Sequence, residues 1–182
     1  GMVVYTHCHS TTVADILLEA QEMGKKFVVM LTETRPLYQG RIMAKQLSDA
    51  GIPVHYFADG GMRLAIKEAD VMFIGAHAIG HNCKVYNTIG SEMAAETAQR
   101  FQVPVYVCSD SLKFAFHHKE VPIEERDKDE LWQDAPKKVF VENFAFEKVD
   151  PSVIDGFICE LGIYNPKEFL VQVRKEYAQW LC

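Results

Sequence analysis

The sequence predicts an α/β protein in which helices cover a mostly parallel sheet of about six to seven strands. Strand-like and helix-like segments alternate along the chain. Each strand-like segment is apolar on both faces, which is typical of parallel strands covered by helices. The chain has 182 residues, of which 48% are hydrophobic, enough for one sizeable core. We therefore expect a single soluble domain over residues 2–182, with Gly1 left from a purification tag.

The first half of the chain carries the clearest alternation. Residues 2–6 are apolar and β-rich, which predicts a strand. Thr12 then precedes apolar residues at 13, 16, 17 and 20, a spacing that forms one helix face, and Gly24 ends this helix. The same alternation continues, with strands expected at 27–31, 54–58, 71–74 and 105–108 and helices at 40–50, 60–69 and 88–101.

The second half of the chain is less regular. Residues 109–138 are polar and end in a charged stretch at 124–130, so we expect a long excursion that is functional or partly mobile. His117 and His118, just before that stretch, are expected on the solvated surface. Apolar runs at 139–141 and 156–159 predict two late strands. Pro166 opens a C-terminal helix whose apolar side carries Phe169, Leu170, Val173, Tyr177 and Leu181.

Charge and cysteine content argue against several classes of protein. Lys and Arg total 19 against 25 Asp and Glu, and no basic block appears, so nothing indicates binding to nucleic acid. No run approaches the roughly 18 apolar residues of a membrane helix, and no signal peptide is visible. The five cysteines are odd in number and form no CxxC pair, which favours free thiols in a reducing, cytoplasmic compartment.

Polar side chains follow each predicted strand of the first half. Ligands of parallel α/β sheets bind beyond the carboxyl ends of the strands, so we expect these loops to converge on one pocket. The loop residues that carry useful chemistry are His7, Cys8, His9, Ser10, Thr11, Thr12, Glu33, Arg35, Gln39, His77, Asn87 and Lys113.

Cys8 lies between a predicted strand and the start of a helix. The N–H groups and dipole of a helix N-terminus lower the pKa of a thiol and attract anions. His7 and His9 would lower it further if protonated. This arrangement indicates a reactive thiolate or a proton-transfer group beside a phosphate-binding turn at residues 10–12. An inert cysteine with two ordinary polar neighbours fits the same spacing.

Other loop residues remain open between a functional and a structural role. His77, His81 and Cys83 could form a metal-binding cluster, but their spacing matches no standard zinc pattern, and we expect neither a metal nor a cofactor. Arg35 with Glu33 fits an anion clamp or a structural ion pair. Lys113 fits a phosphate contact or an exposed lysine equally well.

The loop sequences contain a set of short motifs that runs over nearly all of the chain. These motifs are Thr-His-Cys-His-Ser at 6–10, Glu-Thr-Arg-Pro at 33–36, Gln-Gly at 39–40, Gly-Ala-His at 75–77, Ile-Gly after Asn87, Ser-Leu-Lys-Phe at 111–114, Asn-Phe-Ala-Phe at 143–146 and Glu-Leu-Gly at 160–162. Taken together, they resemble the C-terminal domain of the translation initiation factor 2B alpha/beta/delta family. This family includes the ribose-1,5-bisphosphate isomerases and the methylthioribose-1-phosphate isomerases.

The resemblance implies a Rossmann-like, three-layer domain that forms a homodimer or pairs with a related subunit, and that binds neither nucleic acid nor membrane directly. It also implies a phosphorylated small molecule as ligand. Cys8 would be the catalytic acid or base, and Ser10 and Lys113 would hold the phosphorylated sugar. The further contacts expected from the same loops are Thr11, Arg35, Gln39 and Asn87.

Three features depart from the isomerase pattern. The isomerases carry aspartate where His77 stands and lysine where Thr88 stands, and the family's N-terminal helical domain is not among these residues. We therefore expect a no longer catalytic initiation-factor-2B-like domain that binds a phosphorylated sugar, a nucleotide or a partner subunit. The first alternative is an active aldose–ketose isomerase for a C1-phosphorylated pentose, with Cys8 as acid and His77 as base. The second is another sugar-phosphate or coenzyme-ester function on the same scaffold.

Overall fold

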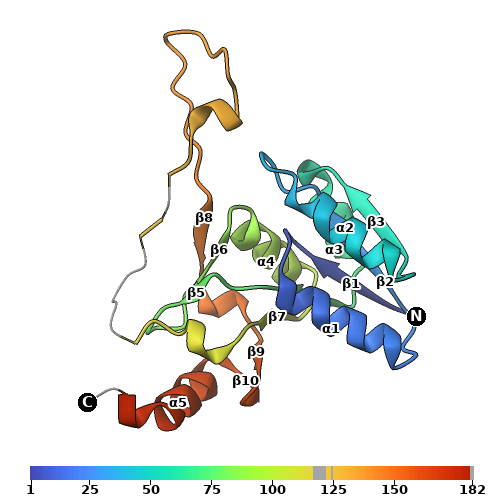
Figure 1. The fold of residues 1–182 in the computed structure, drawn as a ribbon, viewed down its shortest axis with the longest axis vertical. Coiled ribbons are helices and arrows are strands. Elements are labelled where there is room, and N and C mark those ends of the chain that lie inside the picture. The colour runs from blue at the N-terminus through green and yellow to red at the C-terminus, as the bar shows by residue number, and fades with distance from the viewer. Residues whose placement is uncertain (117–121, 124, 181–182) are drawn as a thin grey trace.

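A seven-stranded sheet forms the centre of the computed structural model, which describes residues 1–116, 122–123 and 125–180 (Figure 1). Five neighbouring strand pairs are parallel, and the edge pair β10–β9 is antiparallel. This confirms the expected mostly parallel sheet. The strands lie across the sheet in the order β10 (Gly162–Tyr164), β9 (Gly156–Cys159), β7 (Val105–Cys108), β4 (Val71–Ile74), β1 (Met2–Thr6), β2 (Phe27–Thr32) and β3 (Val54–Phe57).

Helices cover both faces of this sheet, which confirms the three-layer architecture. One hydrophobic cluster joins one face to α1 (Thr11–Glu22) and α2 (Gln39–Asp49). A larger cluster joins the other face to α3 (Met62–Lys67), α4 (Ser91–Arg100) and α5 (Pro166–Glu176). Successive strand residues serve opposite clusters, as Val4 and Tyr5 do in β1. This two-sided burial explains why the strand segments read as continuous apolar runs.

A small antiparallel sheet was not predicted. It consists of β5 (Ala78–Ile79), β6 (Val85–Thr88) and β8 (Phe146–Val149). Two to four residues per strand carry too little alternation to be recognised. The predicted helix at 88–101 was therefore wrong at its start: Thr88 ends β6, Gly90 adopts φ 97°, and α4 begins at Ser91. The predicted helix at 60–69 is found as a 3-10 turn at Asp59–Gly61 followed by α3.

The polar excursion forms an arm, defined here as residues 125–145, that extends away from the body of the molecule (Figure 1). The strand predicted at 139–141 is wrong, because these residues pair with no strand and Phe140 is 89% exposed. An apolar run predicts a strand only where a neighbouring strand is available to pair with it. The expectation for His117 and His118 lies outside the described residues.

The C-terminal helix is confirmed as α5. Asn165 caps its first turn in a reciprocal capping box with Glu168, and Phe169 and Val173 are fully buried against the sheet. Leu181 lies outside the described residues. Four cysteines are free thiols, namely Cys8, Cys83, Cys108 and Cys159. Within the part of the chain that the structure describes, no helix is long and apolar enough to cross a membrane.

Candidate active site

The predicted loops meet in a cavity of about 270 Å3 at the carboxyl ends of the parallel strands. Seven of the eight residues predicted for the site line it: Ser10, Thr11, Arg35, Gln39, His77, Asn87 and Lys113. Cys8 is 4% exposed and contacts two lining residues, Gln39 and Thr88, from beneath. Convergence of these loops follows from the parallel sheet, since every βα connection begins at the same edge.

Three neighbours hold the Cys8 residue. Its backbone adopts φ 67°, a left-handed conformation that costs a non-glycine residue about 1–2 kcal/mol, and its N–H donates to Thr34 Oγ1. The thiol donates to Gln39 Oε1 at 2.8 Å, and Thr88 Oγ1 donates to Cys8 Sγ at 3.2 Å. A strained residue held this firmly next to a cavity is typical of functional positions.

The expected lowering of the Cys8 pKa was wrong. Burial raises the pKa of the Cys8 thiol, and the hydrogen bond from Thr88 offsets only part of that effect. His7 gives no positive charge to oppose it, because burial lowers the pKa of the His7 imidazole. At neutral pH the thiol is therefore protonated, and it is suited to donate a proton rather than to act as a thiolate.

His7 is part of the framework below the cavity. Its Nε2 lies 2.9 Å from the Ile89 carbonyl, which can only accept, so Nε2 carries the hydrogen. Its Nδ1 then accepts from the Thr32 hydroxyl at 2.9 Å. These two bonds tie the loop after β1 to β2 and to the turn at Ile89 and Gly90. A Cβ at Gly90 would approach His7 Nε2 to 2.8 Å, so the ring and this turn are packed closely.

Ser10 acts first as a helix cap. Its hydroxyl accepts from the Val13 N–H at 3.3 Å at the start of α1, where Thr11 is the first helical residue. A Cβ at Gly75 would come within 2.5 Å of Ser10 Oγ, so glycine at this position allows the β4 loop to approach the turn. The Ser10–Thr11 turn therefore lies against the Gly-Ala-His loop, and both line the cavity.

His77 lies at the mouth of the cavity and is exposed. Its backbone N–H donates to the Tyr86 carbonyl, and its ring stacks on Phe146 with 4.5 Å between centroids. Asn87 is buried, and its amide donates to Ser91 Oγ at the start of α4, which gives it a structural role in addition to its place in the lining.

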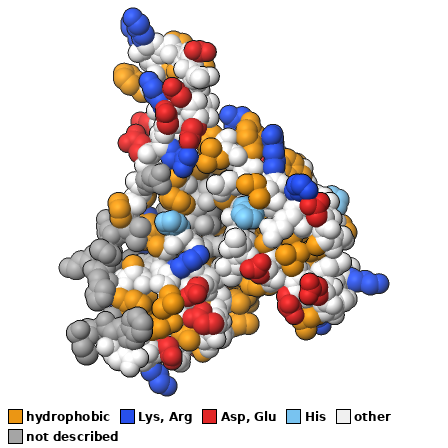
Figure 2. All heavy atoms as spheres, viewed as in Figure 1, with side chains coloured by type: hydrophobic (Ala, Val, Ile, Leu, Met, Phe, Trp, Pro, Cys, Tyr) orange, Lys and Arg blue, Asp and Glu red, His pale blue; other side chains and the backbone are white. Residues whose placement is uncertain are grey.

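The cavity has a marked excess of positive charge. Three cations from separate segments line it, Arg35, Lys113 and Arg126, and none of its lining residues in the described part of the chain is acidic. Lys113 Nζ donates to the Ala76 carbonyl, and the Arg35 guanidinium donates to Tyr38 Oη. Figure 2 shows histidine and basic side chains on the surface below the arm. Such a cavity is suited to an anion.

The considered metal cluster does not form among the described residues, where no group of three or more His, Cys, Asp or Glu is arranged to hold a metal ion. Cys83 is buried and its thiol donates to the Pro166 carbonyl. His9 contacts Gln46 Oε1 through Nε2. Cys83 therefore serves the packing of neighbouring segments, whereas His9 also lines the cavity.

Sequence reasoning missed one wall of the cavity. Arg126, Phe144, Ala145 and Phe146 line it from the arm and its junction with β8. Residues 144–146 stood out in the sequence only as part of a family motif, and Arg126 belongs to a charged stretch that is typical of solvated surface.

Comparison with known proteins shows the family of this chain. The Initiation factor 2 subunit family matches residues 1–166, and the chain belongs to this family. A ribose 1,5-bisphosphate isomerase of Pyrococcus furiosus is 38% identical over 98% of this chain and 57% of its own length. A putative translation initiation factor eIF-2B subunit 2-like protein of the same organism is 34% identical over 94% of this chain and 60% of its own length. The chain thus spans somewhat over half the length of these curated relatives.

Solved structures show the same fold. The translation initiation factor eIF-2B of Pyrococcus horikoshii OT3 superimposes with a TM-score of 0.83 at 31% identity, covering 93% of this chain and 60% of that chain. A 5-methylthioribose 1-phosphate isomerase of the same organism gives a TM-score of 0.87 at 25% identity, covering 96% and 55%. Isomerases and initiation factors therefore share this architecture, and the site has to decide between them.

Proposed function

We propose that this chain forms the substrate-binding and catalytic part of an aldose–ketose isomerase that acts on a C1-phosphorylated pentose, with ribose 1,5-bisphosphate as the first substrate to test. The protonated Cys8 thiol beneath a cationic cavity, whose described lining residues include no acid, is the observation that carries this proposal. Relatives named ribose 1,5-bisphosphate isomerase support the catalytic alternative over the non-catalytic function that the departures first favoured.

The chemistry needs one proton donor and one proton acceptor. A sugar phosphorylated at C1 cannot open its ring spontaneously, so the ring oxygen must receive a proton as its bond to C1 breaks. The electron-deficient C1 then receives a hydride from C2, and the 2-hydroxyl loses its proton as the C2 ketone forms. A buried neutral thiol suits the first step, and a histidine at the cavity mouth suits the second.

Substitutions of Cys8 and His77 test this assignment. Cys8→Ser and His77→Ala are each expected to lower kcat by about 100-fold or more, the usual contribution of a general acid or base. His81→Ala is the matched control, since His81 is exposed and outside the cavity lining. A steady-state assay of ketose formation measures all three. If both single variants, Cys8→Ser and His77→Ala, retained the turnover of the unmodified chain, the proposal would be contradicted.

His77→Asp adds a readout that a structural role would not affect. This variant restores the aspartate that the isomerases carry, and a carboxylic acid ordinarily titrates well below an imidazole. We expect turnover to be retained and the acidic limb of the pH–rate profile to move to lower pH. An unmoved limb would mean that residue 77 does not act as the base.

A second candidate is a subunit of an initiation-factor-2B-type assembly that binds a ligand without turnover. His77 and Thr88, at the positions of the isomerase aspartate and lysine, favour it. The solved tetrameric eIF2B-beta2-delta2 complex from C. thermophilum shows that relatives of this fold assemble with one another. Tight binding of the sugar phosphate with no turnover by the unmodified chain would select this candidate.

A further inference from the structure

The arm contributes to the cavity through its base. Glu125 and Phe144 form an isolated antiparallel bridge, and the Arg126 N–H donates to the Asn143 carbonyl at 2.8 Å. The two limbs of the arm are therefore joined at this point. Directly beyond it, the Ile89 N–H donates to the Ala145 carbonyl, which fixes the base of the arm to the turn before α4. Arg126 thus occupies a defined position in the cavity wall.

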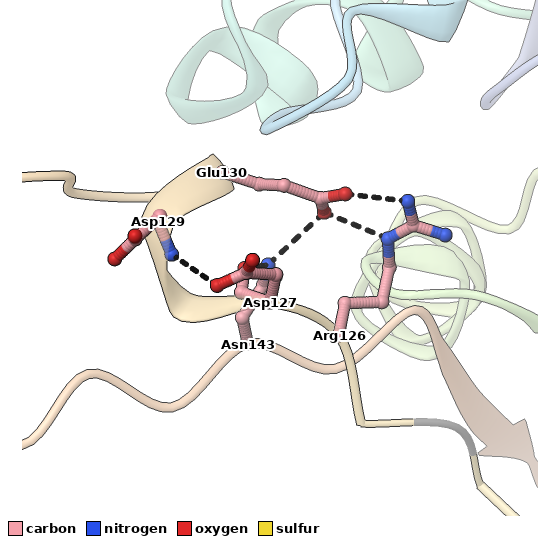
Figure 3. Close-up of polar contacts among 5 residues, drawn as sticks. All are labelled: Arg126, Asp127, Asp129, Glu130 and Asn143. Atoms are coloured by element: carbon pink, nitrogen blue, oxygen red, sulfur yellow. Dashed lines mark hydrogen bonds and ion pairs between the residues drawn. The ribbon is translucent and has the colours of Figure 1, made fainter.

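Glu130 and Asn143 fix the direction of the Arg126 side chain (Figure 3). Arg126 Nε and Nη2 donate to the two carboxylate oxygens of Glu130 at 2.7 and 2.6 Å. Asn143 Nδ2 donates to Glu130 Oε2 and to the Asp127 carbonyl, and Asn143 is buried. A paired arginine and carboxylate in this parallel geometry allow little freedom to the guanidinium plane.

Arg126 belongs to the lining of the cavity, whereas its carboxylate partner does not. Arg126 lines the cavity and its side chain is 30% exposed, while Glu130 is absent from the lining. The carboxylate therefore orients the cation without adding an acidic group to the cavity. Arginine presents several N–H donors in one plane, which suits it to a phosphate group.

We propose that Arg126 is a ligand-binding residue of this cavity and contacts one of the two phosphates of a pentose bisphosphate. This inference rests on the proposed function, and it adds to it a residue that the arm supplies. The other phosphate then remains for the Ser10–Thr11 turn and its neighbours on the β1 and β4 side of the cavity. A purely structural role would instead make the Arg126–Glu130 pair a clamp that only closes the base of the arm.

Three ligands separate the two roles: ribose 1,5-bisphosphate, ribose 1-phosphate and ribose 5-phosphate. In calorimetric titrations, Arg126→Gln is expected to lower the affinity for ribose 1,5-bisphosphate by about tenfold or more, the effect of losing one charge-assisted hydrogen bond. The same variant should lower the affinity for one monophosphate by a similar factor and leave the affinity for the other nearly unchanged. A residue that binds one phosphate must distinguish between the two monophosphates, and which of them weakens identifies the end that Arg126 holds.

Lys128→Gln provides the matched control. Lys128 lies two residues from Arg126, its side chain is exposed, and it is outside the cavity lining, so this variant removes one positive charge without changing the cavity. We expect all three affinities to stay within about twofold of the unmodified chain, since distant surface charges are screened. Arg126→Lys keeps the charge and loses the planar donors, and it should give an intermediate loss for the same two ligands. This variant also serves if Arg126→Gln does not fold.

The outcomes separate this inference from the proposed function. If the unmodified chain binds the ligands and the Arg126 variants bind them equally well, the role of Arg126 is refuted and the proposed function stands. Equal losses of affinity for the two monophosphates would indicate general damage to the cavity, and they would also refute the role of Arg126. If the unmodified chain binds none of the three ligands, both proposals fall together.

Discussion

Two opposing effects act on the Cys8 thiol. Burial raises its pKa, and the Thr88 hydroxyl, which donates to Sγ, lowers it. Thr88→Val should therefore raise the pKa further and slow alkylation of Cys8 near pH 8 by about fivefold, the equivalent of one hydrogen bond of roughly 1 kcal/mol. Iodoacetamide labelling followed by peptide mass spectrometry measures this rate across pH.

Thr88→Ser is the control for that measurement, because it keeps the hydroxyl and should retain the original rate profile. Labelling of fully buried Cys108 reports on any general opening of the fold. Faster labelling of Cys8 in Thr88→Val, with Cys108 unchanged, would contradict the stabilising role of this hydroxyl.

His7 links the pH to the stability of the fold. Burial lowers its pKa in the folded chain, so the unfolded chain binds the proton more readily. Stability from this residue is fully present above the ordinary histidine pKa of about 6.5 and is lost as the pH falls below it. Urea midpoints at pH 7.5 and 5.5 should differ less in His7→Gln than in the unmodified chain. An unchanged difference would assign the acid sensitivity to other groups.

At the scale of elements, the sequence predicted what long buried segments determine. The strands of the parallel sheet before residue 110 and the helices α1, α2 and α5 were confirmed, because burial on two faces or on one helical face leaves a periodic pattern. The short strands β5, β6 and β8 were missed, since each is only two to four residues long and the β6–β8 pair joins segments about sixty residues apart. The wrong strand at 139–141 had the apolar residues of a strand but no partner.

The candidate site divides in a similar way. The sheet topology alone was enough to place the polar loop residues at one cavity, and eight of the twelve residues named from these loops line it. The protonation state of Cys8 could not be predicted, because its pKa depends on burial in the folded chain and on a hydrogen bond from Thr88, which lies 80 residues away in the sequence. Arg126 could not be found either, because only the folded arm brings this charged stretch to the cavity.

At the scale of the whole molecule, the net charge opposes the proposed ligand. The chain carries a formal charge of −6, whereas the cavity is lined by three cations and no described acidic residue. Charges farther away than the Debye length, about 8 Å at physiological ionic strength, are largely screened, so the groups in the cavity should dominate. This balance predicts the sign of a salt effect.

Raising KCl from 50 to 500 mM shortens the Debye length from about 14 Å to about 4 Å. Binding of ribose 1,5-bisphosphate should weaken as a result, because salt screens its attraction to the nearby cations. Calorimetric titrations at several salt concentrations measure the dependence, and Arg126→Gln should make it shallower because one of the three cations is gone. If the net charge of −6 governed the encounter instead, added salt would relieve repulsion and affinity would rise. Such a rise would mean that the ligand does not bind among Arg35, Lys113 and Arg126, and the cavity would then have to be abandoned as the phosphate site.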